Sequence, residues 1–186
     1  MAQSALIAPV PEAQSVVGRL RERHDPAALE GVPPHITTLF PFVDPLEIDG
    51  NVIDALRAAV SDVPSFEFRL RRVARFPATV YLAPEPTAPF VNLTRSIVRT
   101  FPSYPPYGGQ FDTAVPHLTV AHGPPHVLEA AELELVASLS RGPELRLTCK
   151  ALLLITNTTG RWTEVHQISL GSLTVTRRTV RGSSDA

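Results

Sequence analysis

One short phrase, proline-histidine-apolar-threonine, occurs twice in this chain and limits what the chain can fold into. The first copy holds His35 and Thr37, and the second holds His117 and Thr119. Both copies open apolar runs that read as β-strands, and side chains two positions apart on a strand point to the same face, about 7 Å apart. If the two strands face each other, two imidazoles and two hydroxyls surround one anion-sized space without any need for a metal.

A histidine and a threonine at this spacing arise easily by chance, so the evidence for a functional motif lies in the residues around them. The chain has 6 histidines and 19 prolines among 186 residues, so a proline before both motif histidines is improbable as an accident. A single strand histidine is more often structural than catalytic, but a matched pair with matched hydroxyls forms a constellation of acid–base and donor groups. We therefore interpret His35 and His117 as catalytic residues, and Thr37 and Thr119 as phosphate-binding residues.

Composition places the chain among ordinary globular proteins and excludes several kinds of site. Hydrophobic residues make up 44% and charged residues 19%, in a length that suits one domain or two small lobes with a shared core. The net charge of −1 creates no global field for nucleic acid, so any affinity for a polyanion must be local. A single cysteine excludes an internal disulfide, and neither zinc-like spacing nor a glycine-rich phosphate loop is present. We expect no metal and no cofactor.

The chain shows no sign of a membrane segment. It begins without a basic stretch followed by a long apolar one, and no apolar run approaches the roughly 18 residues that a spanning helix needs. We therefore expect a cytoplasmic protein that does not associate with membranes. No obligate protein partner is evident.

Apolar periodicity divides the chain into two halves with the same order of elements. Strands are expected over 4–10, 35–40, 66–73, 79–83, 117–122, 144–147 continuing into 152–156, and 161–170. Helices are expected to begin at Pro11 and Pro45, and to span 86–101 and 124–140. We expect one α+β domain over 1–186, with pseudo-symmetric lobes over 1–77 and 78–171, two antiparallel sheets and a central cleft. Residues 172–186 read as a C-terminal strand or tail.

At its two motifs this chain resembles the 2H phosphoesterase superfamily, whose best-known branch is the 2′-5′ RNA ligase-like proteins. The resemblance extends to residues 5–11 and 80–84, and to the closing stretch from Trp162 to residues 168–171. It implies a bilobal α+β fold with pseudo-two-fold symmetry. It also implies metal-independent cleavage, and sometimes joining, of 2′-linked phosphodiesters. The implied substrate is a nucleotide or an RNA end that carries a 2′,3′-cyclic phosphate.

Two histidines on opposite walls suit the hydrolysis of such a phosphate. One neutral imidazole takes a proton from water, and one imidazolium gives a proton to the departing ribose oxygen. Both protonation states are accessible at neutral pH, because an ordinary histidine has a pKa of about 6.5. Threonine hydroxyls would donate to the non-bridging oxygens. The motifs are symmetric and do not assign the roles; the resemblance favours His35 as the acid and His117 as the base.

Several other residues are candidates for contacts with the substrate, and each has a plain structural alternative. Tyr81 has the strand parity of Thr79 and Ala83, so it either lines the cleft and stacks on a base or belongs to the core. Tyr107, in a loop rich in proline and glycine, either contacts the nucleobase or decorates a turn. Arg75, at a hairpin end, is a candidate for phosphate binding or simply a surface arginine. Strict alternation turns His122 away from the face of His117.

The leading interpretation is a metal-independent cyclic phosphodiesterase, and three alternatives stay open. The same motifs suit RNA 2′-5′ ligation or cleavage of a small cyclic phosphate that is unrelated to RNA. A nucleotide- or RNA-end-binding module would keep the cleft without turnover. The near-neutral charge favours a small substrate over a long RNA, because contacts to many phosphates require several Lys or Arg side chains.

Overall fold

The structure is a computed structural model that describes residues 2–110, 114–142 and 144–171. Its strands are β1 (Ser4–Pro9), β2 (His35–Leu39), β3 (Phe66–Phe76), β4 (Thr79–Glu85), β5 (Leu118–His122), β6 (Leu145–Cys149), β7 (Ala151–Thr156) and β8 (Thr163–Ser169). Its α-helices are α1 (Gln14–His24), α2 (Pro26–Leu29), α3 (Gly50–Val60), α4 (Ala88–Thr100) and α5 (Pro125–Arg141). Short 3-10 turns are η1 (Pro11–Ala13), η2 (Pro45–Glu47) and η3 (Pro106–Gly109).

The strands form two four-stranded sheets in the orders β2-β1-β7-β8 and β5-β4-β3-β6. Every pairing within them is antiparallel. The two motifs occupy equivalent places, because β2 and β5 are both edge strands, and a proline stands just before β2 and two residues before β5. This arrangement confirms the predicted α+β fold with two related antiparallel sheets.

The sheets do not divide the chain at its midpoint. The hairpin of β7 and β8 pairs with β1, whereas β3, from the first half, pairs with β4. Lys150 alone separates β6 from β7, so one nearly continuous run pairs with β3 in one sheet and with β1 in the other. The expected lobes over 1–77 and 78–171 therefore differ from the division of strands between the sheets. The tail expected over 172–186 lies outside the described residues.

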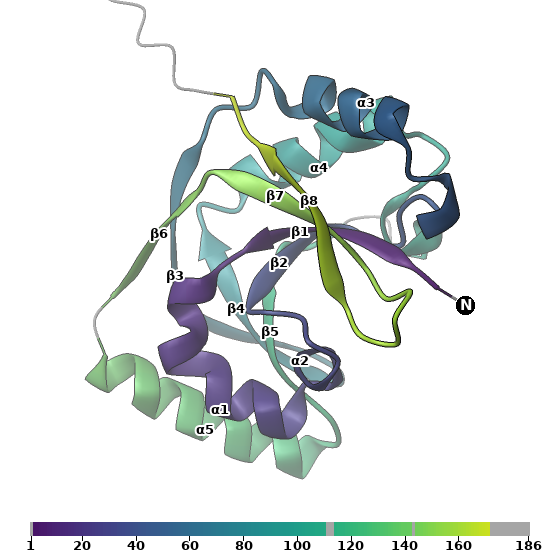
Figure 1. Cartoon of the computed structure of the whole chain (residues 1–186). Coiled ribbons are helices and arrows are strands. Elements are labelled where there is room, and N and C mark those ends of the chain that lie inside the picture. The colour runs from purple at the N-terminus through teal and green to yellow at the C-terminus, as the bar shows by residue number, and fades with distance from the viewer. Residues whose placement is uncertain (1, 111–113, 143, 172–186) are drawn as a thin grey trace, which may run out of the picture.

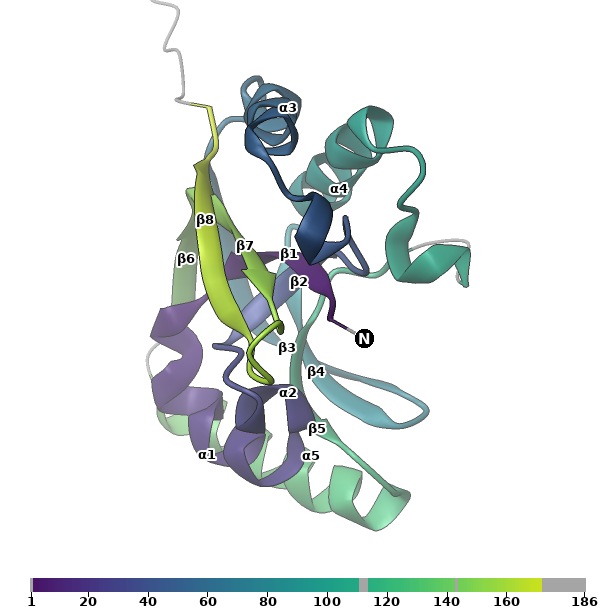
Figure 2. The same ribbon diagram turned by 45° about the vertical axis from the view of Figure 1, so that its right-hand side comes forward.

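The helices form two pairs at opposite ends of the molecule (Figures 1 and 2). Helices α1 and α5 pack on each other and on β5, while α3 and α4 pack on each other, with α4 against β2. Strand β2 therefore packs against α4, the helix that precedes the second motif. Strand β5 packs against α1, a helix that precedes the first motif. None of the helices in the described ranges is long and apolar enough to cross a membrane.

Local chemistry explains where several elements begin. Pro45 starts a 3-10 turn, and not the expected helix, because the carboxylate of Asp49 caps α3 by accepting a hydrogen bond from the Val52 N–H at 2.9 Å. After α1, Asp25 accepts a hydrogen bond from the Ala27 N–H at 3.1 Å and so starts the short helix α2. The capping side chain directly before each helix thus decides where α3 and α2 begin.

One continuous apolar core joins both sheets to both helix pairs. Along β3, Phe68 and Leu70 are buried while Glu67 and Arg69 are exposed, as the alternation predicts. Phe90 of α4 is 1% exposed and packs edge-on against Phe68, with ring centroids 5.0 Å apart. A second, smaller cluster covers the other face of β1 and β7, and contains Ala5, Ile7, Val32 and Ile155.

We predict that Phe90→Ala lowers the free energy of unfolding by about 3–5 kcal/mol, because it removes a fully buried ring that contacts two other phenylalanines. Chemical denaturation would measure the change. Leu46→Ala is the matched control, since Leu46 is 93% exposed and its loss should change stability by no more than about 0.5 kcal/mol. Equal effects of the two changes would contradict this placement of Phe90.

Candidate active site

The two motif histidines are held in the same way. His35 opens β2 and His117 immediately precedes β5, and these two strands contact each other. Nδ1 of His35 lies 2.8 Å from the Pro33 carbonyl oxygen, and Nδ1 of His117 lies 2.7 Å from the Val115 carbonyl oxygen. A carbonyl oxygen only accepts, so each Nδ1 carries the proton and donates. In both rings Nε2 is then the nitrogen that can take up or release a proton.

Both imidazoles are partly withdrawn from water, and this changes their titration. The pKa of His35 is lowered to about 4: burial is the largest cause, the bond to the Pro33 carbonyl opposes it, and the positive charges of Arg21 and His117 add to the lowering. Burial also lowers the pKa of His117. Because the charge of His117 acts on His35, the two rings are electrostatic neighbours despite their distance in the sequence.

Each motif threonine shares the face of its histidine. In β2, His35 and Thr37 are half-buried while Ile36 between them is fully buried. In β5, Thr119 is half-buried between Leu118 and Val120, which both belong to the core. The apolar residue inside each motif therefore anchors the strand, and the histidine and threonine point away from the core.

Tyr81 lies beside His117. It is opposite Thr119 in the pairing of β4 with β5, and its ring centroid is 5.3 Å from that of His117. Tyr81 also stacks on Phe76, at 4.3 Å between centroids and 29° between ring planes, and Phe76 lies 5.0 Å from His117. Sequence reasoning placed Tyr81 on this face by its parity but missed Phe76. The signal for Phe76 was the short hairpin between β3 and β4, which sets Phe76 opposite Thr79.

A cleft of about 520 Å³ opens next to His117. It is lined by Phe76, Pro77, Ala78, Thr79, Tyr107, Ala114, Val115 and His117. A much smaller hollow continues from it toward Thr37 and also has Tyr107 in its wall. The main-chain N–H of Tyr107 donates to the Phe40 carbonyl at 2.6 Å, so the loop before the second motif is fastened to the strand of the first. Tyr107 thus lies between the two motifs.

The structure does not place Arg75 beside the motif histidines and threonines. Its guanidinium pairs with Glu132 of α5. Arg75 is opposite Val80 in the strand pairing, and Val80 belongs to the core, so Arg75 extends from the helix-covered face of β3. Its neighbour Phe76 points to the other face, which carries Tyr81.

His122 lies on the face from which strict alternation would turn it away. A bulge interrupts the pairing of β4 with β5, so Tyr81 is opposite Thr119 while Thr79 is opposite His122. The Thr79 hydroxyl and Nδ1 of His122 are 3.1 Å apart. The expectation that His122 faces away from His117 is therefore wrong, because one extra residue in β5 restores the shared face.

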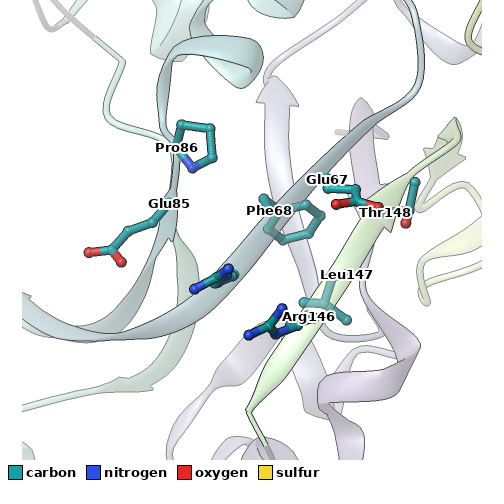
Figure 3. A pocket seen from close by; sticks show the side chains of 8 residues that line it. Glu67, Phe68, Glu85, Pro86, Arg146, Leu147 and Thr148 are labelled. Carbon is teal, nitrogen blue, oxygen red and sulfur yellow. The ribbon is translucent and has the colours of Figure 1, made fainter. Parts of the chain in front are cut away.

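A second pocket, of about 410 Å³, lies where β3, β4 and β6 meet (Figure 3). None of the described residues that line it is a histidine, and its arginines are already engaged: Arg69 and Arg146 share the carboxylate of Glu144, at 3.2 and 2.7 Å. Glu85, at its edge, is four residues beyond Tyr81 along β4, or about 13 Å. This pocket is thus separate from the histidines, and its cations are largely neutralised.

In the ranges that the structure describes, no group of three or more His, Cys, Asp or Glu side chains is arranged to hold a metal ion. Among the described residues, the functional groups that line the cleft are the imidazole of His117, the hydroxyls of Thr79 and Tyr107, and the aromatic rings of Phe76 and Tyr107.

Comparison with known proteins identifies the family. The model of the 2′-5′ RNA ligase superfamily matches residues 9–161, which include both motifs. The chain belongs to this superfamily. The family resemblance noted from the motifs, to the 2H phosphoesterases and their 2′-5′ RNA ligase-like branch, is thereby confirmed. No curated protein sequence matches the chain.

Solved structures share the superfamily fold at low sequence identity. The TT0787 protein of Thermus thermophilus superposes with a TM-score of 0.59 at 17% identity, covering 92% of this chain and 99% of that one. Escherichia coli LigT in complex with NADP+ superposes with a TM-score of 0.56 at 16% identity, covering 91% and 98%. LigT in complex with 3′-AMP gives 0.52 at 15% identity, covering 90% and 97%. The near-complete coverage in both directions supports the fold assignment.

We predict that His35 makes the stability of the protein depend on pH. Because its pKa is about 4 in the folded protein against 6.5 ordinarily, the unfolded chain binds more protons between these values. The free energy of unfolding therefore falls as the pH is lowered through this window. Chemical denaturation at about pH 7 and about pH 4.5 should show a smaller difference for His35→Gln than for the wild type. The control is His126→Gln: His126 is exposed, so this change should leave the difference in the free energy of unfolding between the two pH values as in the wild type. An equal effect of His35→Gln and His126→Gln would contradict the prediction.

Proposed function

We propose that this protein is a metal-independent phosphodiesterase that hydrolyses 2′,3′-cyclic phosphates, on a nucleotide or an RNA end, by two-histidine general acid–base catalysis. Superfamily membership supports a phosphoesterase or ligase. The observation that carries the proposal is the matched pair of imidazoles, each with its Nδ1 proton bound to a carbonyl two residues earlier and each influenced by burial. Both rings therefore offer Nε2 for proton transfer.

In the proposed reaction, water attacks phosphorus and one phosphorus–oxygen bond of the ring breaks. A neutral imidazole takes the water proton at Nε2, and the other imidazole, protonated, gives its proton to the departing ribose oxygen. The product is a ribose phosphomonoester with one hydroxyl restored, so atoms and protons balance. Hydroxyls of Thr37 and Thr119 donate to the non-bridging oxygens, where negative charge grows in the transition state.

The lowered pKa values of both histidines are consistent with this cycle. A cyclic phosphodiester carries one negative charge, and an opposite charge within about 4–6 Å raises the pKa of a histidine. Bound substrate therefore counteracts the burial that disfavours the imidazolium in both rings. One proton can then be shared between two histidines on either side of the phosphate.

The cleft beside His117 suits the nucleoside part of the substrate. Its walls are mostly apolar and include Phe76 and Tyr107, with Tyr81 packed behind Phe76. Aromatic side chains stack on nucleobases irrespective of their sequence. The complexes of E. coli LigT with NADP+, 3′-AMP and ATP add support for a nucleotide as ligand.

We predict that His35→Ala and His117→Ala each lower kcat/KM for a 2′,3′-cyclic mononucleotide by about 10²–10⁴, because each removes one acid–base group. Turnover is to be measured with EDTA present, which also tests independence from metals. The exposed His126→Ala serves as the control and should keep wild-type activity. Wild-type turnover by either folded motif variant would refute the mechanism. Binding of the nucleotide without turnover by the wild type would point to a binding module.

We predict that Thr37→Val and Thr119→Val each lower kcat by about 10²-fold with a smaller change in KM. Valine keeps the branched shape of threonine on the strand, so the change removes the hydroxyl donor and little else. Steady-state kinetics on the same cyclic nucleotide would give both parameters. A change in KM alone would show that the hydroxyls contribute equally to ground-state and transition-state binding.

RNA ligation is the second candidate, because the matching family model is named for it. Ligation uses the same acid–base pair, with an RNA 5′-hydroxyl in place of water. An RNA with a 2′,3′-cyclic end, incubated with an acceptor that bears a 5′-hydroxyl, separates the two activities. A longer product identifies a ligase, and a phosphomonoester end identifies a hydrolase.

A further inference from the structure

The segment that leads into His35 is held in an unusual way. Pro33 and Pro34 have no N–H group, so the main chain there can be fixed only through its carbonyls. Three consecutive carbonyls accept hydrogen bonds: that of Val32 from Nη2 of Arg21 at 3.2 Å, that of Pro33 from His35 at 2.8 Å, and that of Pro34 from the Val10 N–H at 2.8 Å. Arg21 is the one side chain among these partners outside the motif itself.

Arg21 is buried, with 2% of its surface exposed near the end of α1. Its Nε donates to Oδ2 of Asp25 at 2.9 Å. The other carboxylate oxygen of Asp25 accepts from the Ala27 N–H, and the Ala27 carbonyl accepts from the Val32 N–H at 2.9 Å. Arg21 and Asp25 thus close a ring of hydrogen bonds around the residue that precedes the two prolines.

Stability alone does not explain a buried ion pair at this place. Removing two charges from water is costly, and well-packed apolar residues of the same volume often serve a fold equally well. The guanidinium of Arg21, however, also provides a directed donor to the Val32 carbonyl and a fixed positive charge that acts on His35. Both the hydrogen-bond donor and the positive charge therefore act on the segment that carries the first motif.

The second motif has different neighbours. Within the described residues 114–116, the hydrogen bonds include no arginine donor, and the Val115 carbonyl accepts from His117 itself. The rings of Phe76 and Tyr81 pack on His117 instead. Two histidines with matching carbonyl bonds therefore sit in different electrostatic surroundings.

We propose that Arg21, held by Asp25, is a positioning residue for His35, because it fixes the main chain that orients the imidazole and places a permanent positive charge behind it. The groups that act on His35 are Arg21 from α1 and His117 from the start of β5, while Asp25 faces Arg21, and Tyr107 of η3 lies against β2. Arg21 disfavours the imidazolium and so lowers the pKa of His35 beyond the effect of burial. The inference rests on the proposed function only where turnover is measured.

The test is an NMR titration of the imidazole carbon-bound protons in the wild type and in the double variant Arg21→Met/Asp25→Asn, which removes both charges and keeps a capping side chain at 25. The pKa of His35 should rise from about 4 part of the way toward 6.5, while that of His117 changes less. The control is Arg23→Met/Glu134→Gln, which removes an exposed ion pair between α1 and α5 and should change the pKa of neither histidine. An unchanged His35 titration in the folded double variant would overturn the proposal.

Arg21→Lys provides the second measurement and does not depend on the tolerance of the double variant. Lysine keeps the charge but cannot reach Asp25 and Val32 together with the planar fork of a guanidinium. We expect the pKa of His35 to stay low and kcat for a cyclic nucleotide to fall about 10-fold. Wild-type kcat in this variant would overturn the positioning role. Absence of turnover in the wild type, with the His35 titration still dependent on Arg21, would instead reject the proposed function and leave this inference standing.

Discussion

The two sheets of this protein are joined because one run of chain belongs to both. Strand β6 pairs with β3, and after Lys150 the same run continues as β7 and pairs with β1. Two residues beyond β8, the chain closes the connection from the other side, where the Gly171 N–H donates to the Val63 carbonyl at 2.8 Å. Side chains have little room at this point, since a Cβ on residue 171 would collide with the Ser61 carbonyl. The relative position of the edge strands β2 and β5, and hence of both histidines, depends on this shared run.

The same construction explains how a short motif becomes a site. Proline sets the start of each strand, the central apolar residue enters the core, and the flanking histidine and threonine are left on the opposite face. The bond from Nδ1 to a carbonyl two residues earlier then determines which nitrogen is presented. Local geometry therefore repeats, whereas the surroundings do not: a buried arginine acts on one ring and aromatic rings pack on the other.

Features encoded locally could be predicted from the sequence, and features created by pairing could not. The α+β class, most strand positions and the side of Tyr81 followed from periodicity. The pairing partners of β7 and β8 could not be predicted, because the sequence of an apolar run does not specify which strand it pairs with. His122 was assigned to the wrong face because a bulge is a property of two strands and not of one. The sequence could not decide whether Arg75 binds phosphate or is a surface arginine, because only the packed structure sets Glu132 of α5 against it. Arg21 shows the same limit: its spacing to Asp25 is common on helix surfaces, yet the structure buries it under the loop that carries the first motif.

The composition of the cleft wall has a consequence for selectivity. Apart from His117, the polar side chains that line it within the described residues are Thr79 and Tyr107, both of which carry a hydroxyl. A hydroxyl can donate or accept and so does not discriminate between an amino and a keto group on a base edge. If a nucleobase occupies this space, purines and pyrimidines differ there mainly in the area that they stack, and adenine and guanine should be accepted almost equally.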